Sequence, residues 1–399
     1  MITRQEFPYL QELVINDAYA VKNLRVPVFA PGQEFKHLVL TGRNGSGKTT
    51  VLRGLAETLK YPGHIFNQEN TVKAVLSKAL VETDSRFGND HLEMGVLTNG
   101  QKKPLNHNHI VNAFFQTRRE VHVADVHSVI SEQMMEYNAL SVGQGGDLVS
   151  SFKQYLVNKK IFQVFDAMEG RNDAALQQEK FFTDLEAYFR DIFQDPGIKL
   201  EFVRESFEFY INISNGRRIT FNQLSAGFSA FLSILMDLLM RVDLLRKQAN
   251  DYTYDPCGFV LIDEPETHLH LEMHYQILPL LTSLFPNLQF IVATHSPAVT
   301  SSIRNATVFD LSTGQALGDT AAGSSFSELM QTHFGLENEY SNVADTILAE
   351  VAEIGQMPDQ AGALARMRKL LEEQGRYMSP VLRLDVQAQL LHLQREQAA

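Results

Sequence analysis

Cysteines, long uncharged apolar runs and an excess of basic side chains are all missing from this 399-residue sequence. Its one cysteine, Cys257, excludes a disulfide framework within the chain, and without a Cys-x-x-Cys pair a structural zinc site is not expected. The most apolar segment, residues 228–245, is interrupted by charges, so we expect a buried helix there rather than a membrane span. No apolar stretch follows the first residues, and we therefore expect a soluble, cytoplasmic protein.

The charge balance limits the classes of partner. With 47 acidic against 35 basic side chains the net charge is −12, so the chain is poorly suited to coat nucleic acid by bulk charge. A local basic patch stays compatible with phosphate binding, and basic pairs occur at 118–119, 159–160 and 217–218. For each pair, solvated surface is the preferred interpretation. The apolar share of 44% excludes a mostly disordered protein.

Strand and helix patterns alternate along the chain. Short strands are expected at 10–15, 24–29 and 37–40, a helix at 51–59, and a strand-like stretch over 91–123 around an Asn99–Gly100 turn. Helical spacing over about 129–193 is followed by strands at 199–203, 207–213 and 218–221. Two buried strands, 259–262 and 290–293, flank a helix, and the pattern from residue 324 onward is helical. The length is compatible with one large domain or with two.

The most specific motif is GRNGSGKTT at residues 42–50, which fits the phosphate-binding pattern GxxxxGK[ST] between a strand and a helix. Gly45 and Gly47 permit backbone angles that let successive amides point at phosphate oxygens. The helix that begins near Lys48 adds its positive N-terminal end. Lys48 then supplies a cation between the β and γ phosphates, and the hydroxyl of Thr49 is suited to magnesium.

A second motif, GFVLIDEPETHLH, occupies residues 258–270. Its consecutive apolar residues predict a strand buried on both faces, as in a parallel sheet. Asp263 and Glu264 follow at the carboxyl end, where open α/β sheets bind their ligands. One carboxylate there can complete a magnesium shell, and its neighbour can orient or deprotonate an attacking water.

Two shorter motifs are ambiguous on their own. His295 follows the buried strand 290–293, and a histidine at a strand end is more often a packed or surface residue than a functional one. Leu224, Ser225 and Gly227 precede the long apolar helix, where Ser225 is also an ordinary N-cap candidate. Spacing alone leaves both interpretations open.

Taken together, the phosphate loop, LSAGFS (224–229), LIDEPETHLH (261–270) and VATHSP (292–297) resemble the head of an ATP-binding-cassette (ABC) ATPase. The GxNGxGK[ST] loop looks like that of the soluble RecF-, SMC- and OLD-like branch. More closely, the chain resembles the stand-alone bacterial family of predicted ATP-binding proteins involved in virulence, which is similar to the PtuA-like ATPases of Septu and retron anti-phage systems. The resemblance covers nearly the whole chain.

This resemblance implies an α/β fold in which a mixed β-sheet carrying the phosphate loop is joined to an antiparallel β lobe and a helical lobe. The ATPase domain would span 1–323, with a helical insertion at about 129–193, and a C-terminal helical extension would span 324–399. Its expected ligands are ATP and Mg²⁺. The expected nucleotide-binding residues are Gly42, Asn44, Gly45, Ser46, Gly47, Lys48, Thr49 and Thr50.

The same resemblance assigns roles to the other motifs. Magnesium would be held by Thr49, Asp263 and Gln116. Glu264 would be the catalytic base, and His295 would be the switch histidine that senses the γ-phosphate. The signature residues Leu224, Ser225 and Gly227 would close over the ATP of a second subunit.

Some details depart from the family pattern or need a separate interpretation. Phe228 and Ser229 follow the signature glycine where Glu or Gln is usual, and Leu271 stands where proline is common. The histidines 268, 270 and 274 are interpreted as flanking a helix rather than binding a metal, and the first lies in the loop that usually lines the dimer seam.

The function implied is a nucleotide-driven switch, a homodimer or higher even-numbered oligomer that controls a separate effector such as a nuclease. The tail from residue 324 carries no DxD pair, so a nuclease would be another chain. Nucleic acid is kept as a candidate partner and no membrane is expected. The main alternative is a RecF- or SMC-like DNA-repair or DNA-maintenance ATPase, and less favoured ones are a transporter motor and a scaffold that binds ATP and barely hydrolyses it.

Overall fold

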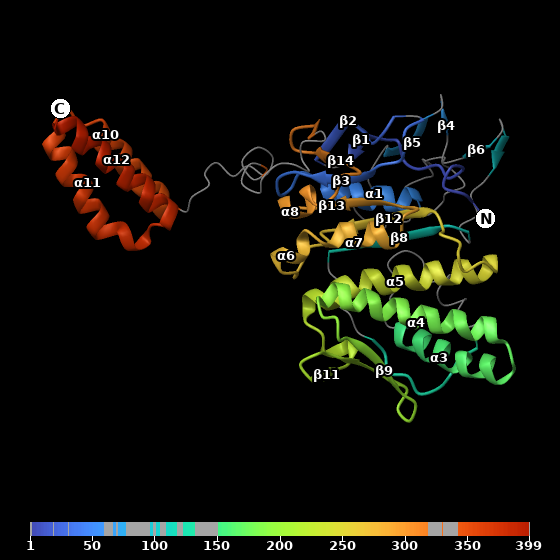
Figure 1. The fold of residues 1–399 in the computed structure, drawn as a ribbon. Coiled ribbons are helices and arrows are strands. Elements are labelled where there is room, and N and C mark those ends of the chain that lie inside the picture. The colour runs from blue at the N-terminus through green and yellow to red at the C-terminus, as the bar shows by residue number, and fades with distance from the viewer. Residues whose placement is uncertain are drawn as a thin grey trace. The chain divides into compact units, whose positions relative to one another are not determined.

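The computed structural model describes two compact units, Met1–Phe326 and Ser327–Ala399. The described residues are 2–18, 20–30, 32–59, 67–68, 71–76, 96–98, 101–103, 109–117, 123–131, 151–317, 329 and 342–398. Figure 1 shows the first unit as stacked layers of strands and helices and the second as a group of helices. The domain limits 1–323 and 324–399 stay a prediction.

A six-stranded sheet, ordered β15-β14-β3-β13-β12-β8, forms the centre of the first unit. Its strands are β3 (His37–Thr41), β8 (Val111–Phe115), β12 (Gly258–Asp263), β13 (Leu288–Ala293), β14 (Ala306–Asp310) and β15 (Gln315–Ala316). Five of them are parallel, and β15 alone runs antiparallel to its neighbour β14. Because parallel strands end at the same edge, the segments that follow β3, β13, β12 and β8 come together there.

Both faces of this sheet are covered. Val260 and Ile262 of β12 belong to one hydrophobic core, and Phe259 and Leu261 belong to the other. Helix α1 (Lys48–Leu59) packs against β12 and β13 on one face, and the second core includes its apolar side chains. A strand buried on both faces needs an unbroken apolar run, which is why the sequence of β12 shows no alternation.

A smaller sheet, ordered β2-β1-β5-β4, lies on the far side of α1 from the central sheet (Figure 1). Its strands are β1 (Glu12–Ala18), β2 (Val21–Pro27), β4 (Asn67–Gln68) and β5 (Thr71–Leu76). A separate antiparallel pair, β6 (Val96–Thr98) and β7 (Gln101–Lys103), flanks the expected Asn99–Gly100 turn, which itself lies outside the described residues.

A helical lobe covers the other face of the central sheet. Its helices are α3 (Phe152–Met168), α4 (Asn172–Phe193) and α5 (Ala226–Ala249), and α5 contacts both α3 and β8. Beyond them lies an antiparallel sheet of β9 (Lys199–Val203), β10 (Glu208–Asn212) and β11 (Arg218–Ile219), followed by the short 3₁₀ helix η3 (Phe221–Gln223) (Figure 1).

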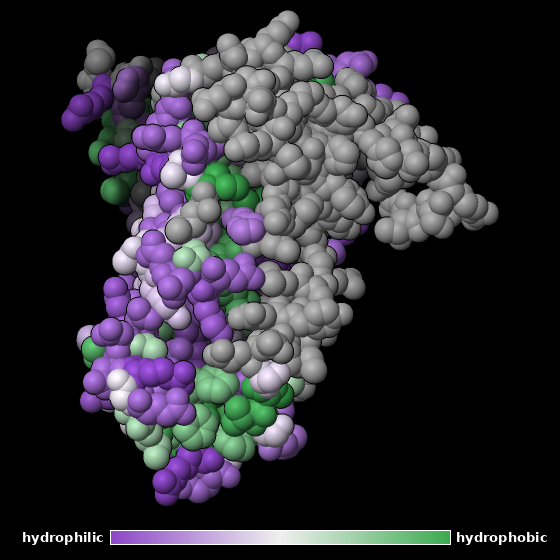
Figure 2. Space-filling model, turned by 90° about the vertical axis from the view of Figure 1, so that its right-hand side faces the viewer, coloured by the Kyte–Doolittle hydropathy of each residue, from purple (hydrophilic) through white to green (hydrophobic). Residues whose placement is uncertain are grey.

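One expectation about this lobe is wrong. Lys159, assigned to solvated surface, is buried, with its ammonium 2.9 Å from Asp243 Oδ2 and 2.8 Å from Gln178 Oε1. The charge is tolerated inside the lobe because it is paired and hydrogen-bonded there. Apolar side chains are exposed instead on α3 and α4, namely Val164, Phe165, Met168 and Leu176. Figure 2 shows apolar surface gathered at the lower end of the molecule, where the helical lobe lies.

The other helices in the described part of the first unit are α6 (Leu271–His274), α7 (Ile277–Leu284) and α8 (Pro297–Ser301). The second unit contains α10 (Asn342–Gly355), α11 (Gln360–Gln374), η5 (Gly375–Tyr377) and α12 (Pro380–Ala398), which share a core of their own. As the Ser-Pro pair predicts, the hydroxyl of Ser379 accepts the amide hydrogen of Leu382 at 3.2 Å. Within the described part of the chain, no helix is both long and apolar enough to span a membrane.

The predicted α/β class is confirmed by this arrangement. The central sheet is mixed, the phosphate loop connects β3 to α1, and separate β-rich and helical layers cover its two faces. Layers on both faces are needed because every residue of β12 and β13 is buried, so their apolar side chains must be covered on both sides.

Candidate nucleotide-binding site

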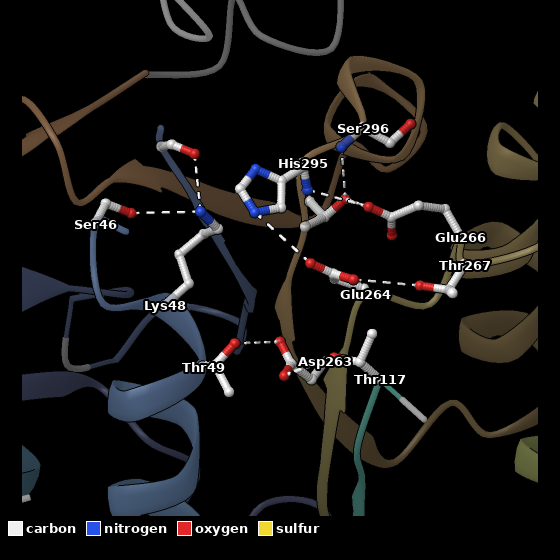
Figure 3. Close-up of polar contacts among 12 residues, drawn as sticks. Ser46, Lys48, Thr49, Thr117, Asp263, Glu264, Glu266, Thr267, His295 and Ser296 are labelled. Atoms are coloured by element: carbon white, nitrogen blue, oxygen red, sulfur yellow. Dashed lines mark hydrogen bonds and ion pairs between the residues drawn. The ribbon is translucent and has the colours of Figure 1, made fainter. Parts of the chain in front are cut away.

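The phosphate loop is held in shape by its own lysine. Lys48 is the first residue of α1, and its Nζ donates to the carbonyl oxygens of Gly42 at 2.8 Å and Arg43 at 3.1 Å and to Ser46 Oγ at 3.3 Å (Figure 3). From the other side, Ser312 Oγ accepts the amide hydrogen of Arg43 at 2.7 Å. The loop backbone is therefore fixed at several points.

Two glycines show why this loop suits a phosphate. Gly45 and Gly47 have φ angles of 80° and 91°, in the left-handed region that glycine adopts readily. A Cβ at Gly47 would approach Val21 Cγ2 to 3.0 Å, whereas one at Gly45 would meet nothing within 4 Å. The loop thus packs on its inner side and opens at Gly45, leaving room for an anion at the N-terminus of α1.

The cation of Lys48 lies close to two carboxylates. Burial lowers the pKa of Lys48, and the charges of Glu264 and Asp263 oppose that shift. Removing this ammonium would remove a positive charge that interacts with both carboxylates. The same positive charge is placed to attract a polyphosphate.

A donor set for Mg²⁺ lies at the start of α1 and at the ends of β12 and β8. Thr49 Oγ1 donates to Asp263 Oδ1 at 3.2 Å, and Thr117 Oγ1 donates to Asp263 Oδ2 at 2.9 Å. Hydroxyl and carboxylate oxygens are the ligands that Mg²⁺ prefers, so Thr49 and Asp263 fit this ion. Gln116, the third expected ligand, is exposed directly after β8. Thr117, which the sequence did not indicate, is the residue that contacts the carboxylate.

Glu264 follows β12, His295 follows the neighbouring strand β13, and their side chains face each other. His295 Nε2 lies 3.6 Å from Glu264 Oε1, and Thr267 Oγ1 donates to Glu264 Oε2 at 3.3 Å (Figure 3). The backbone of Glu264 has φ of 50°, a left-handed conformation that is unusual outside glycine, and its amide donates to Ala293 O at 2.8 Å. Strained backbone of this kind is found at functional sites where the surroundings hold it in place.

The ring of His295 is kept neutral. Burial lowers the pKa of His295 first and the Lys48 cation second, while the carboxylates of Glu264 and Asp263 act in the opposite direction. Because the ordinary pKa of 6.5 is already below neutrality, the neutral imidazole predominates at pH 7. A neutral ring can donate one hydrogen bond and accept another without adding charge.

A further carboxylate, Glu266, anchors the segment that carries His295. Its Oε1 accepts hydrogen bonds from Thr294 Oγ1 at 2.6 Å and from the amide of His295 at 3.0 Å. Glu266 was not predicted from the sequence. The only available signal was a second acid two positions beyond Glu264 in the same loop.

The signature residues lie at the start of α5. Ser225 is the exposed N-cap of α5, but its side chain makes no capping hydrogen bond. A Cβ on Gly227 would come within 2.2 Å of the carbonyl oxygen of His268, so the close approach of two backbones requires glycine there. Phe228 stacks on Phe193 with ring centroids 4.7 Å apart, and Leu224 is half-buried.

Among the histidines after β12, His274 makes structural contacts. His274 Nδ1 lies 2.9 Å from Ser296 Oγ, and its Nε2 lies 3.1 Å from the carbonyl oxygen of Leu269, so both ring nitrogens have partners. His270 is the N-cap residue of α6. Among the residues that the structure describes, no group of three or more His, Cys, Asp or Glu side chains could hold a metal ion.

The structure therefore brings together Lys48, Thr49, Asp263, Glu264 and His295, which the sequence singled out across more than 200 positions. Lys48 and Thr49 begin α1, the helix that follows β3. Asp263 and Glu264 lie at the end of β12, His295 follows β13, and Thr117 follows β8. A cation, a paired set of oxygen donors, a carboxylate and a neutral imidazole in one place can bind a phosphate ester and activate a water against it.

Comparison with known proteins supports this assignment. Residues 146–301 match the family model described as "AAA domain, putative AbiEii toxin, Type IV TA system". The chain is 40% identical over 93 residues to the "Retron Ec83 probable ATPase" of Escherichia coli, covering 23% of this chain and 17% of that protein. It is 24% identical over 275 residues to the "Septu protein PtuA" of Bacillus thuringiensis, covering 65% of this chain and 66% of that protein.

Among solved structures, similarity extends to the "SmcHead bound to the C-winged helix domain of ScpA", with 14% identity and a TM-score of 0.36 over 72% of this chain and 89% of that chain. The matched regions cover 17% of the length of the retron ATPase and 66% of the length of PtuA, so each spans less than two thirds of the relative. The similarity to PtuA-like ATPases of Septu and retron systems, predicted from the motifs, is confirmed by these relatives.

Proposed function

We propose that this chain binds ATP together with Mg²⁺ and hydrolyses it to ADP and phosphate. The observation that carries the proposal is the convergence of Thr49, Asp263 and the Glu264–His295 pair at one edge of the central sheet. The similarity to proteins named as probable ATPases supports it.

In this account the phosphate loop and Lys48 bind the β and γ phosphates, and Thr49 and Asp263 hold Mg²⁺, which when bound neutralises charge on the phosphate oxygens. Glu264 accepts a proton from water as the water oxygen forms a bond to the γ-phosphorus. The bond from that phosphorus to the oxygen bridging the β-phosphate breaks, and ADP and phosphate leave. The neutral ring of His295 donates a hydrogen bond to the γ-phosphate oxygens.

The proposed active unit is a homodimer with composite sites. Ser225 is exposed at the N-terminus of a 24-residue helix and its side chain makes no capping hydrogen bond, so its hydroxyl is available to an anion. A helix N-terminus favours such a ligand. We assign this anion to the γ-phosphate of ATP bound by the partner subunit, an arrangement that two-fold symmetry would supply twice.

The proposed role is that of a cytoplasmic switch that controls a separate effector in anti-phage defence. Its supports are the similarity to Septu PtuA and retron ATPases and the apolar side chains exposed on the helical lobe, a feature typical of protein–protein contact. The DNA-maintenance alternative has less support, since Lys159 is buried in an ion pair and Arg218 pairs with Glu201. Residues 1–323 are assigned to an ATPase domain and residues 324–399 to a helical extension.

Phosphate release by the purified chain, with Mg²⁺ and with EDTA, tests the activity. We expect Mg²⁺-dependent release that Lys48→Ala abolishes and that Lys180→Ala, a change of an exposed lysine on α4, leaves intact. Release that survives Lys48→Ala would assign the activity to a contaminant or to another site.

A further inference from the structure

We propose that Glu266 is a positioning residue that holds His295 in place for the γ-phosphate. The inference rests on the proposed ATPase function and assigns a role to a second carboxylate of the loop after β12. That role is independent of Glu264, because Glu266 contacts the backbone that carries the histidine rather than its ring.

The contacts of Glu266 are directed at one short segment. Its Oε1 accepts from Thr294 Oγ1 at 2.6 Å and from the amide of His295 at 3.0 Å (Figure 3). Its other oxygen, Oε2, is buried without a hydrogen-bond partner. Burying a carboxylate oxygen in this way lowers the stability of the folded protein. A contribution of Glu266 to folding stability therefore does not account for its presence.

The segment held by Glu266 is also fixed from its other sides. The amide of Thr294 donates to the carbonyl oxygen of Leu40 at the end of β3, at 3.0 Å. Thr294 Oγ1 in turn accepts the amide hydrogen of Ser296 at 2.9 Å, which places the Thr294 hydroxyl between Glu266 and Ser296. The residues on both sides of His295, Thr294 and Ser296, are therefore held by hydrogen bonds.

A second connection returns to the loop of Glu266. Ser296 Oγ, which caps α8, lies 2.9 Å from His274 Nδ1, and His274 Nε2 lies 3.1 Å from the carbonyl oxygen of Leu269. The loop after β12 is thus tied to the histidine segment at two points, Glu266 and Leu269. With the backbone fixed in this way, the ring of His295 can stay 3.6 Å from Glu264 Oε1.

The test compares two replacements of Glu266. Glu266→Gln keeps the shape of the side chain and an oxygen acceptor where Oε1 lies. Glu266→Leu removes the acceptor while filling similar space. Glu272→Gln and Glu272→Leu, at an exposed glutamate on α6, are the matched controls.

We expect Glu266→Leu to lower kcat by about tenfold or more, as loss of an outer-shell contact commonly does, with ADP affinity unchanged. In a Glu264→Gln background that prevents turnover, Glu266→Leu should also reduce the preference for ATP over ADP. Glu266→Gln should stay within about twofold of wild type. Combining Glu266→Leu with His295→Ala should give no further loss beyond His295→Ala alone, because both changes act through one ring.

Three results would overturn the proposal: an unchanged kcat in Glu266→Leu, losses that multiply with those of His295→Ala, or equal weakening of ATP and ADP. If Glu266→Leu does not fold, Thr294→Val removes one of its two donors and should lower kcat, whereas Thr294→Ser should restore it, and equal activity of these two variants would also overturn it. A wild-type chain that binds no nucleotide would instead contradict the proposed function.

Discussion

Thr49 Oγ1 donates a hydrogen bond to Asp263 Oδ1 at 3.2 Å, although 214 positions of sequence separate the two residues. Thr49 lies in α1, which follows β3, and Asp263 ends β12; β13 lies between these two strands. The two side chains meet because α1 begins at the edge where β12 ends. A single bound Mg²⁺ could therefore draw oxygen ligands from both elements.

The first prediction concerns the loop cation. Lys48→Ala should weaken ATP binding by at least ~100-fold, since it removes the cation that faces the phosphates. Titration calorimetry measures the affinity, and the melting temperature reports whether the variant is folded. A folded variant with wild-type affinity would contradict the assignment of the loop.

The second prediction separates binding from chemistry. Glu264→Gln keeps the shape of the side chain but cannot accept the proton of the attacking water, so ATP affinity should persist while kcat falls by about 10² to 10⁴. With ATP bound and not hydrolysed, size-exclusion chromatography should show an accumulated dimer. Full turnover in this variant would exclude Glu264 as the base.

The third prediction distinguishes two neighbouring residues at the end of β8. Thr117→Val removes the hydrogen bond to Asp263 Oδ2, so the Mg²⁺ concentration for half-maximal activity should rise by about tenfold. Gln116→Ala measures the ligand role that the family resemblance implies for the exposed glutamine. A larger effect of Gln116→Ala than of Thr117→Val would show that the glutamine moves onto the metal when nucleotide binds.

The fourth prediction concerns stability and pH. Burial, with a smaller contribution from Arg4, lowers the pKa of His37 from 6.5 to about 4, and Nδ1 accepts the amide hydrogen of Phe290 at 3.1 Å. The unfolded chain binds a proton near pH 6.5 and the folded chain does not, so the stability present above pH 6.5 is lost as the pH falls toward 4. At about 1.4 kcal/mol per unit of pKa, the full loss is about 3 kcal/mol.

His37→Asn is the matched variant, because its amide oxygen can replace Nδ1 as acceptor without titrating. Denaturant unfolding at pH 7 and pH 5 should show a smaller decrease in the free energy of unfolding for this variant than for wild type. Because other groups, His295 among them, titrate in both proteins, the difference between the two decreases isolates His37. Equal decreases would exclude it as a source of the pH dependence.

Much of the sheet could be predicted from the sequence, for a physical reason. β12 and β13 are buried on both faces, so their apolar runs are unbroken, and the phosphate loop fixes the end of β3. β14 was not predicted because its sequence, ATVFD, mixes polar and apolar residues although four of its five residues are buried. The two-residue strands β4 and β15 carry too few residues for any periodicity.

The site residues that define the sequence motifs could be predicted, and those that act through distant contacts could not. Thr117 and Glu266 act through residues that lie far away in the sequence, Asp263 for the first and the Thr294–His295 segment for the second. Their contacts exist only once β8, β12 and β13 lie side by side, which no local pattern encodes. The free side chain of Ser225 could not be predicted either, because a serine before a helix ordinarily makes a capping hydrogen bond and this one does not.

The most direct test of the dimeric mechanism is a mixing experiment between Lys48→Ala and Ser225→Arg chains. In a composite site each change inactivates both sites of its own homodimer, one through the loop and the other through the signature. A mixed dimer restores one site in which an intact loop faces an intact signature, so an equimolar mixture with random pairing should regain about a quarter of wild-type ATPase activity. No activity in a mixture whose mixed dimers are demonstrated by cross-linking would contradict the shared-site mechanism.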